Sequence, residues 1–496
     1  MEEKASFWSR TRFLIVVGVG FLADGCLNDS IGLVVPMLGY IYFKDNKGKV
    51  PASQGGAIKG GLSLGMIVGQ LMFGFLGDTL GRHKIYGREL LFTLFGTLMC
   101  ILLPWKGISH DGIVAWMAVW RVVTGLGIGG DYPMSSALAA ENAPMGSRAK
   151  LVLSAFFIKG IGEIMTSVSF LVLLAAFKNG IQHNVNRLEW VWRLLFGIAL
   201  IPGALTVYAR FTMKETKPYV EYVQNASTEG ESKKDRTFRE QLDDFRVYFA
   251  DWQHAKALFS LCAVWFLYDI ASYGISLNQS IVLTDIGFAT GSTTYDKLWN
   301  TAVGNLIVIG AGYLPGWFVG IFLPDWMGRK AQQFWFSLAA AVVYAIWAGL
   351  TNHASKGALI TLFALSQFIQ NAGTGITTFL LPVELFPTRV RATAHGLAAA
   401  CGKVGAVITS FAFGSVTNAI GIRGVLGLFA GLMTICALLT ALIPETKGCT
   451  LQDLEDDTLY KGKRISDREL SDTPTPSVGK NDMTKTLPTA STVTEV

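Results

Sequence analysis

The sequence predicts an all-α polytopic membrane protein with twelve transmembrane helices in two six-helix bundles. Hydrophobic residues make up 51% of the 496 residues and charged residues only 16%, which is less charge than a soluble domain of this size carries. Apolar segments long enough to cross a bilayer recur along nearly the whole chain. One polar stretch near the middle of the chain divides these segments into two groups of six.

Each span is predicted from its run of apolar residues, and several runs exceed the roughly twenty residues that a bilayer requires, so we expect tilted or extended helices. The first run, from about Phe13, is too long for a signal peptide and lacks a small-residue cleavage pattern, so we expect it to remain as an anchor. The spans are expected at 12–43, 56–78, 84–104, 111–139, 149–178, 188–212, 256–283, 297–323, 330–352, 356–385, 391–419 and 421–443.

The charged stretch between the sixth and seventh spans cannot cross a membrane, and we predict bundles at 1–212 and 256–444 joined by a central loop at 213–255. The tail at 445–496 becomes rich in Ser, Thr and Pro and buries too little apolar surface to fold, so we expect it to be mostly disordered.

Basic residues predict the orientation of the chain. Arg82, Arg148, Arg329 and Arg389 fall in loops on the same side of the predicted spans, together with the basic central loop. Because short cytoplasmic loops are enriched in Lys and Arg, we expect both termini in the cytoplasm.

Composition also argues against several classes of function. The six cysteines are scattered without paired metal spacing, and the net charge of +6 lies in loops, so we predict neither a metal site nor nucleic-acid binding. The run GLGIGGD imitates a phosphate-binding loop but lies inside a predicted helix rather than after a strand. We therefore expect no cofactor and no enzymatic activity, and a lipid membrane as the surroundings.

The most unusual carboxylate is Asp131, in a glycine-rich predicted helix. Pro133 leaves the carbonyl of Gly129 without its helical donor, which loosens the backbone beside this acid. A charged residue deep in an apolar segment is expensive and indicates an ion or substrate path. The alternative is a buried aspartate that a neighbouring helix satisfies.

An internal repeat links the two halves. Asp78-x-x-Gly-Arg82 follows the second span, and Asp325-x-x-Gly-Arg329 follows the eighth, the corresponding point of the second half. An acid at a helix end, a glycine turn and a basic residue predict a conformational latch between helices on the cytoplasmic side. The alternative is a pair of chance basic loops.

This repeat resembles the major facilitator superfamily. Further matches are Arg121-x-x-x-Gly125 in the fourth span, Glu215-Thr216-Lys217 after the sixth and Pro444–Gly448 after the twelfth. The resemblance implies the major facilitator fold, in which two pseudo-symmetric six-helix bundles rock about a central site that opens alternately to each side.

Side chains suited to such a site lie in the seventh and eleventh spans. Trp265, Asp269 and Tyr273 recur every four residues on one helix face and would form a wall for a polar substrate. The alternative is two interfacial aromatic residues with a stray acid. Lys403 lies among small residues with little room to reach the interface, so it requires an anion.

The first and fifth spans carry further charges. Lys159 precedes Glu163 by one turn, and the two could simply form an ion pair along the helix. Asp24 and Asn28 share a face of the first span. Lysines in opposite halves favour an anionic substrate, and the surplus carboxylates could carry protons, which together describe a proton-coupled anion symporter.

The segments 129–141 and 384–406 and the aromatic–acid pattern at 265–273 also resemble the phosphate:proton symporter family. The resemblance implies proton-pathway roles for Asp24 and Asp131. It implies substrate-site roles for Tyr132, Trp265, Asp269, Tyr273 and Lys403.

Three positions depart from that family. Lys159 replaces a glutamine, Gly375 replaces an asparagine, and Leu27 replaces the second acid of an Asp-x-x-Asp pattern. At these three positions the sequence resembles the fungal glycerophosphodiester transporters. The changes imply a more basic and roomier site, which would suit a bulky phosphodiester.

The leading hypothesis is therefore proton-coupled uptake of glycerophosphoinositol or glycerophosphocholine across the plasma membrane. Inorganic phosphate symport is the alternative. A sugar or other organic-anion porter and a transporter-like nutrient receptor are further readings.

Overall fold

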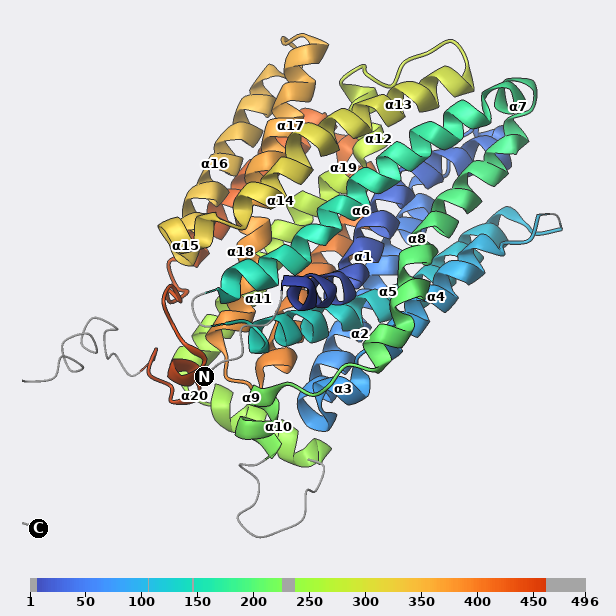
Figure 1. Cartoon of the computed structure of the whole chain (residues 1–496). Helices are drawn as coiled ribbons and strands as arrows, with labels where there is room; N and C mark the ends of the chain where they lie inside the picture. The colour runs from blue at the N-terminus through green and yellow to red at the C-terminus, as the bar shows by residue number, and fades with distance from the viewer. Residues whose placement is uncertain (1–6, 106, 145–146, 225–236, 461–496) are drawn as a thin grey trace, which may run out of the picture.

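The computed structural model describes residues 7–105, 107–144, 147–224 and 237–460, and over these ranges the chain is helical and contains no strand. The long helices lie side by side (Figure 1). Short helices gather at one end of this bundle, which we call the latch end: α3 (Arg82–Ile85), α9 (Lys217–Tyr219), α10 (Phe238–Phe249), α15 (Leu323–Met327) and α20 (Leu451–Glu455). The opposite end, near α7 (Lys178–His183), is the far end.

The helices of the first bundle match the first six predicted spans. They are α1 (Phe7–Tyr42), α2 (Ala52–Leu80), α4 (Arg88–Ile101), α5 (His110–Glu141), α6 (Arg148–Ala176) and α8 (Leu188–Phe211). Large apolar side chains such as Val172 and Leu205 are exposed on them, as expected of a surface that faces lipid.

The helices of the second bundle are more often interrupted. They are α11 (Trp252–Ser276), α12 (Gln279–Asp285), α13 (Thr294–Val308), η4 (Ile309–Tyr313), α14 (Leu314–Gly320), α16 (Arg329–Leu350), α17 (Lys356–Ala372), α18 (Thr374–Leu385) and α19 (Arg391–Thr440). Counted individually, nine helices of the described chain are long and apolar enough to cross a membrane.

Four of the twelve predicted spans are present in altered form. The third is the short helix α4, and the tenth is broken at Gly373 into α17 and α18. The eleventh and twelfth form one continuous assignment, α19, in which Gly421 adopts φ +68° and turns the chain. Glycine tolerates this left-handed conformation because it has no Cβ.

Glycines allow α2 to pack closely against helices of both bundles. A Cβ on Gly129 of α5 would lie 2.4 Å from the carbonyl oxygen of Met66. On the other side of α2, a Cβ on Gly74 would lie 2.6 Å from the carbonyl oxygen of Ala392 in α19. Small residues let helix backbones approach in this way, so α2 joins the bundles along a tight seam.

The beginning of the tail, which we expect to be mostly disordered over 445–496, is folded up to residue 460. Residues up to Tyr460 are described, and α20 starts with a capping box between Thr450 and Asp453. His254 on α11 lies 2.9 Å from the Asp457 carboxylate, which joins this segment to the second bundle. The Ser/Thr-rich part of the predicted tail, from residue 461, lies outside the described residues.

Candidate functional site

A small cavity of about 50 Å³ lies between the two bundles. All seven side chains or positions predicted as substrate-binding line it: Tyr132, Lys159, Trp265, Asp269, Tyr273, Gly375 and Lys403. They come from α5 and α6 of the first bundle and from α11, α18 and α19 of the second. The cavity is therefore built where the halves meet.

On the side of the first bundle, Lys159 is held by an acid of α1. Its ammonium lies 3.1 Å from Asp24 Oδ2 and 3.4 Å from Tyr132 Oη. Tyr132 Oη in turn donates to Asp24 Oδ2 at 2.7 Å. The predicted face shared by Asp24 and Asn28 is present, because the Asn28 amide donates to the Asp24 carboxylate.

Glu163 does not pair with Lys159, the partner that the helical spacing allowed. It accepts a hydrogen bond from Trp317 Nε1 of α14 at 3.2 Å, while Lys159 pairs with Asp24. The alternative of a Lys159–Glu163 pair along the helix is therefore wrong for this conformation.

On the side of the second bundle, Lys403 of α19 donates to Asp269 Oδ2 of α11 at 2.6 Å. The predicted face of α11 is present, because Trp265, Asp269 and Tyr273 all line the cavity. The ammonium of Lys403 lies 4.4 Å from the centroid of the Tyr273 ring, and that of Lys159 lies 5.9 Å from it. Cations from opposite bundles thus flank one aromatic ring.

Several donors that line the cavity have no hydrogen-bond partner among the described residues. These are the hydroxyls of Tyr273 and Tyr313 and the amide nitrogen of Asn371. All three side chains are at most 6% exposed. Because buried polar groups are normally satisfied, donors left open around a cavity suggest a ligand rich in acceptors.

The expectation of a roomier site at Gly375 is wrong. A Cβ at this position would lie 2.4 Å from Tyr268 Oη, so the tyrosine fills the space that a side chain would take. Asn371, one turn earlier on α17, supplies an amide to the same cavity. Tyr268 and Asn371 could not be predicted as site residues, because a lone Tyr or Asn in an apolar helix is common.

Asp131 does not line the cavity. Its carboxylate lies 2.5 Å from the guanidinium of Arg210, which is also 3.1 Å from Glu89, and Ser135 donates to Asp131 at 2.9 Å. These contacts match the alternative interpretation of Asp131, a buried aspartate that a neighbouring helix satisfies. Arg210 and Glu89 were missed because they lie near helix ends, where charged residues usually flank a membrane.

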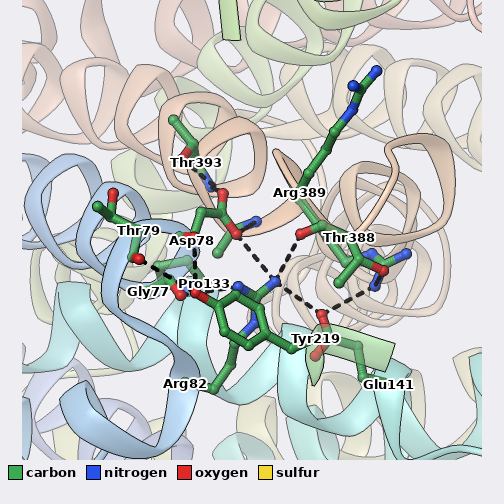
Figure 2. Close-up of polar contacts among 12 residues, drawn as sticks. Gly77, Asp78, Thr79, Arg82, Pro133, Glu141, Tyr219, Thr388, Arg389 and Thr393 are labelled. Atoms are coloured by element: carbon green, nitrogen blue, oxygen red, sulfur yellow. Dashed lines mark hydrogen bonds and ion pairs between the residues drawn. The ribbon is translucent and has the colours of Figure 1, made fainter. Parts of the chain in front are cut away.

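The predicted latch of the first half is a buried network (Figure 2). Arg82 lies 3.0 Å from Asp78 and 2.9 Å from Glu141, and it donates to the Thr388 carbonyl of the second bundle at 2.9 Å. Asp78 accepts from the backbone and hydroxyl of Thr393, both at 2.7 Å. This network therefore joins the bundles at the latch end.

In the latch of the second half, the arginine pairs with the acid of its own motif and with a glutamate of the same bundle, as Arg82 does in the first half. Arg329 lies 3.3 Å from Asp325 and 2.8 Å from Glu384, and Glu384 accepts from Thr446 Oγ1 at 2.8 Å. Among the described residues, an ion pair between Lys150 and Asp325 at 3.4 Å links this latch to the first bundle. Both members of this pair are partly exposed.

Aromatic side chains from both bundles pack beside the cavity. The rings of Phe156 on α6 and Phe379 on α18 stack with centroids 4.0 Å apart. Phe21 on α1 meets both rings edge-on, at 5.3 and 5.4 Å. Of these three, only Phe156 lines the cavity, so the other two form a layer behind its wall.

Comparison with known proteins agrees with this architecture. Over 90% of the chain and 98% of the other, the fold matches the proton:xylose symporter XylE of the major facilitator superfamily, with a TM-score of 0.68 and 19% identity. A partially occluded inward-open structure of XylE from E. coli gives a TM-score of 0.66 over 89% of this chain and 99% of the other, at 17% identity. These matches show that the chain has the same fold as these solved structures.

The family follows from the sequence match. Residues 30–457 match the model of the sugar (and other) transporter family, and the chain belongs to that family. It is 35% identical to a putative inorganic phosphate transporter of Schizosaccharomyces pombe, over 91% of this chain and 89% of the relative. It is 32% identical to the inorganic phosphate transporter PHO84 of Saccharomyces cerevisiae, over 92% of this chain and 86% of the relative.

Proposed function

We propose that this chain carries inorganic phosphate across the plasma membrane together with protons, by alternating access of one central site. The observation that carries the proposal is the meeting of Lys159 and Lys403, from opposite bundles, at one cavity with open hydrogen-bond donors. An oxyanion would satisfy both kinds of group. The names of the relatives, inorganic phosphate transporters, support the same substrate.

The size of the cavity favours inorganic phosphate over a glycerophosphodiester. The cavity has a volume of only about 50 Å³. A tetrahedral anion fits this scale, whereas a diester carries a glycerol and a head group as well. This reverses the preference drawn from the sequence alone, which depended on extra room at Gly375.

Competition for the lysines would couple the anion to protons. Asp24 pairs with Lys159, and Asp269 pairs with Lys403. A proton on either carboxyl releases its lysine for phosphate, so proton and anion binding strengthen each other. Asp29, Glu163 and Asp269 line the cavity, and Asp24 contacts it through Lys159. If all four carboxyls were ionised, they would outnumber the two ammoniums. An added anion therefore requires accompanying protons.

We retain 1–212 and 256–444 as the moving bundles, with the latch end and both termini in the cytoplasm, on the basis of the basic loops. Asp78, Arg82, Asp325 and Arg329 would hold the cytoplasmic side closed. Asp131 is retained as a proton-pathway residue that acts through its pair with Arg210 rather than at the cavity.

The substrate is tested by uptake into cells that lack their own phosphate and glycerophosphodiester carriers. Labelled phosphate, glycerophosphocholine and glycerophosphoinositol are supplied separately at acidic pH, with and without a protonophore. We expect phosphate uptake that the protonophore blocks and that Lys403→Ala abolishes. Phosphate uptake that survives either treatment would contradict the proposal.

A glycerophosphodiester is the second candidate, and one observation favours it. Lys159 adds a second cation to the cavity, at a position where the phosphate symporter family that the sequence resembles has a glutamine. Uptake of one diester without competition by phosphate would establish this candidate in place of the first. Lys159→Gln should then remove diester uptake.

A further inference from the structure

Polar contacts also join the bundles at the far end of the cavity. Lys59 on α2 donates to Asn278 Oδ1, between α11 and α12, at 2.8 Å. Nearby on α12, Ser280 Oγ donates to the carbonyl of Gly32 at 3.1 Å. Asn278 lies between Ser276 and Gln279, which line the cavity. Lys59 therefore stands just beyond the far end of the cavity, facing the second bundle.

Lys59 is buried, but it has no carboxylate of the described residues as an ion-pair partner. Its side chain is 7% exposed, and among the described residues its hydrogen-bond partner is a neutral amide and no carboxylate forms an ion pair with it. The two lysines of the cavity, Lys159 and Lys403, each pair with an aspartate. A buried ammonium with only one neutral partner is poorly compensated, so an anion that reaches it would bind favourably.

The packing around Lys59 leaves it inside the seam between the bundles. A Cβ on Gly56 would lie 2.8 Å from the carbonyl oxygen of Ser410 in α19, and one on Gly60 would lie 3.2 Å from Ser410 Cβ. These glycines flank Lys59 along α2, so the lysine sits where the helices of opposite bundles touch. Its environment must change when the bundles separate at this end.

We propose that Lys59 is an anion-binding residue of the far-end gate, the first buried cation that a phosphate oxyanion meets on its way to Lys159 and Lys403. This role rests on the proposed function and on its orientation, which places the far end outside the cell. Separation of the bundles removes Asn278 and exposes the ammonium to external water and anions. When the anion moves into the cavity, Asn278 takes its place again and the gate closes.

The test compares external and internal phosphate in proteoliposomes that contain the full chain. Lys59→Gln should raise the KM for external phosphate about ten-fold, as expected for one lost hydrogen bond to a charged group, with little change in the maximal rate. Lys59→Arg should stay close to wild type. The half-saturating concentration of internal phosphate in exchange should not change, because the lysine lies at the opposite end of the site.

Asn278→Ala is the matched control, since it removes the same gate contact and leaves the cation in place. We expect an unchanged or lower external KM in this variant. If Asn278→Ala and Lys59→Gln raise the KM equally, or if Lys59→Gln leaves it unchanged, Lys59 only joins the helices and the proposal is wrong. Wild-type protein that carries no phosphate would instead contradict the proposed function, and with it this role.

Discussion

The two latches share one sequence pattern but differ in what they join. In the first half, Arg82 and Asp78 are fully buried and both contact the second bundle, through Thr388 and Thr393. In the second half, Asp325 is 28% exposed, and its link to the first bundle is the exposed Lys150. A repeated motif can therefore close the molecule in one copy and mainly organise its own bundle in the other.

The difference extends to the basic residue that follows each latch. Arg391 of the second bundle lies 3.1 Å from Glu141 of the first, which already holds Arg82 and accepts from Thr216 Oγ1 at 2.5 Å. Arg148, at the matching place in the first half, forms no ion pair with Glu384 in the part of the chain that the structure describes. The latch end is thus held chiefly by the network around Glu141.

The largest expected effect is the loss of the central guanidinium. Arg82→Ala leaves Asp78 and Glu141 buried without this partner, which should cost about 3–5 kcal/mol of stability and abolish uptake. Arg329→Ala should cost less, because it leaves one buried carboxylate, Glu384, without this partner, whereas Asp325 is partly exposed to solvent. Thermal unfolding of the two purified variants in detergent compares them, and an equal loss would contradict the distinction between the latches.

A smaller effect is expected from the acids of the two motifs. Asp78→Asn weakens charged acceptor contacts to the backbone and hydroxyl of Thr393, so transport should fall about ten-fold. Asp325→Asn should leave transport within about two-fold of wild type, since exposed ion pairs contribute little. Uptake rates corrected for the amount of protein at the membrane check both values. A stronger effect of Asp325→Asn would reverse the comparison.

The close packing of α2 against α19 beside the first latch can be tested by adding a methyl group between these helices. Gly74→Ala places a methyl group 2.6 Å from the Ala392 carbonyl, which should cost about 1–3 kcal/mol and favour opening at the latch end. Gly427→Ala is the control, because nothing lies within 4 Å of its added Cβ. Labelling of a cysteine introduced at Thr393 reports opening. Equal labelling in both variants would show that this seam does not hold the latch end closed.

The smallest effect is expected at α20, which packs beside the latches. Thr450→Ala removes the cap of this five-residue helix, and the cost should be about 1 kcal/mol with transport nearly unchanged. Proteolysis after residue 440 should become faster, since the segment would open more often. Loss of transport in this variant would give the segment a larger role in closing the latch end.

The sequence predicted those parts of the site that depend on one helix at a time. A spacing of four residues was enough to place Trp265, Asp269 and Tyr273 on one face, and lone lysines in apolar segments pointed to Lys159 and Lys403. The partners of these lysines could not be predicted, because they depend on which helices touch. The same holds for Tyr268, which fills the space at Gly375 from a different helix.

Charged residues near helix ends were also misinterpreted from the sequence. Glu89 and Arg210 read as residues that flank a membrane, yet both are fully buried, and Arg210 pairs with both Glu89 and Asp131. The sequence predicted that both latch motifs form contacts. It did not predict that the first motif joins the two bundles through buried contacts while the second mainly contacts its own bundle. That asymmetry depends on how α19 packs against α2, for which spacing within either half carries no information.

The central claim is that Asp269 and phosphate compete for Lys403. It is tested most directly by phosphate binding to the purified chain across a range of pH, for wild type and for Asp269→Asn, which imitates the protonated carboxyl. We expect wild-type affinity to weaken as the pH rises and the variant to bind at least as tightly, with a smaller dependence on pH. A variant that binds no phosphate at any pH would contradict the account.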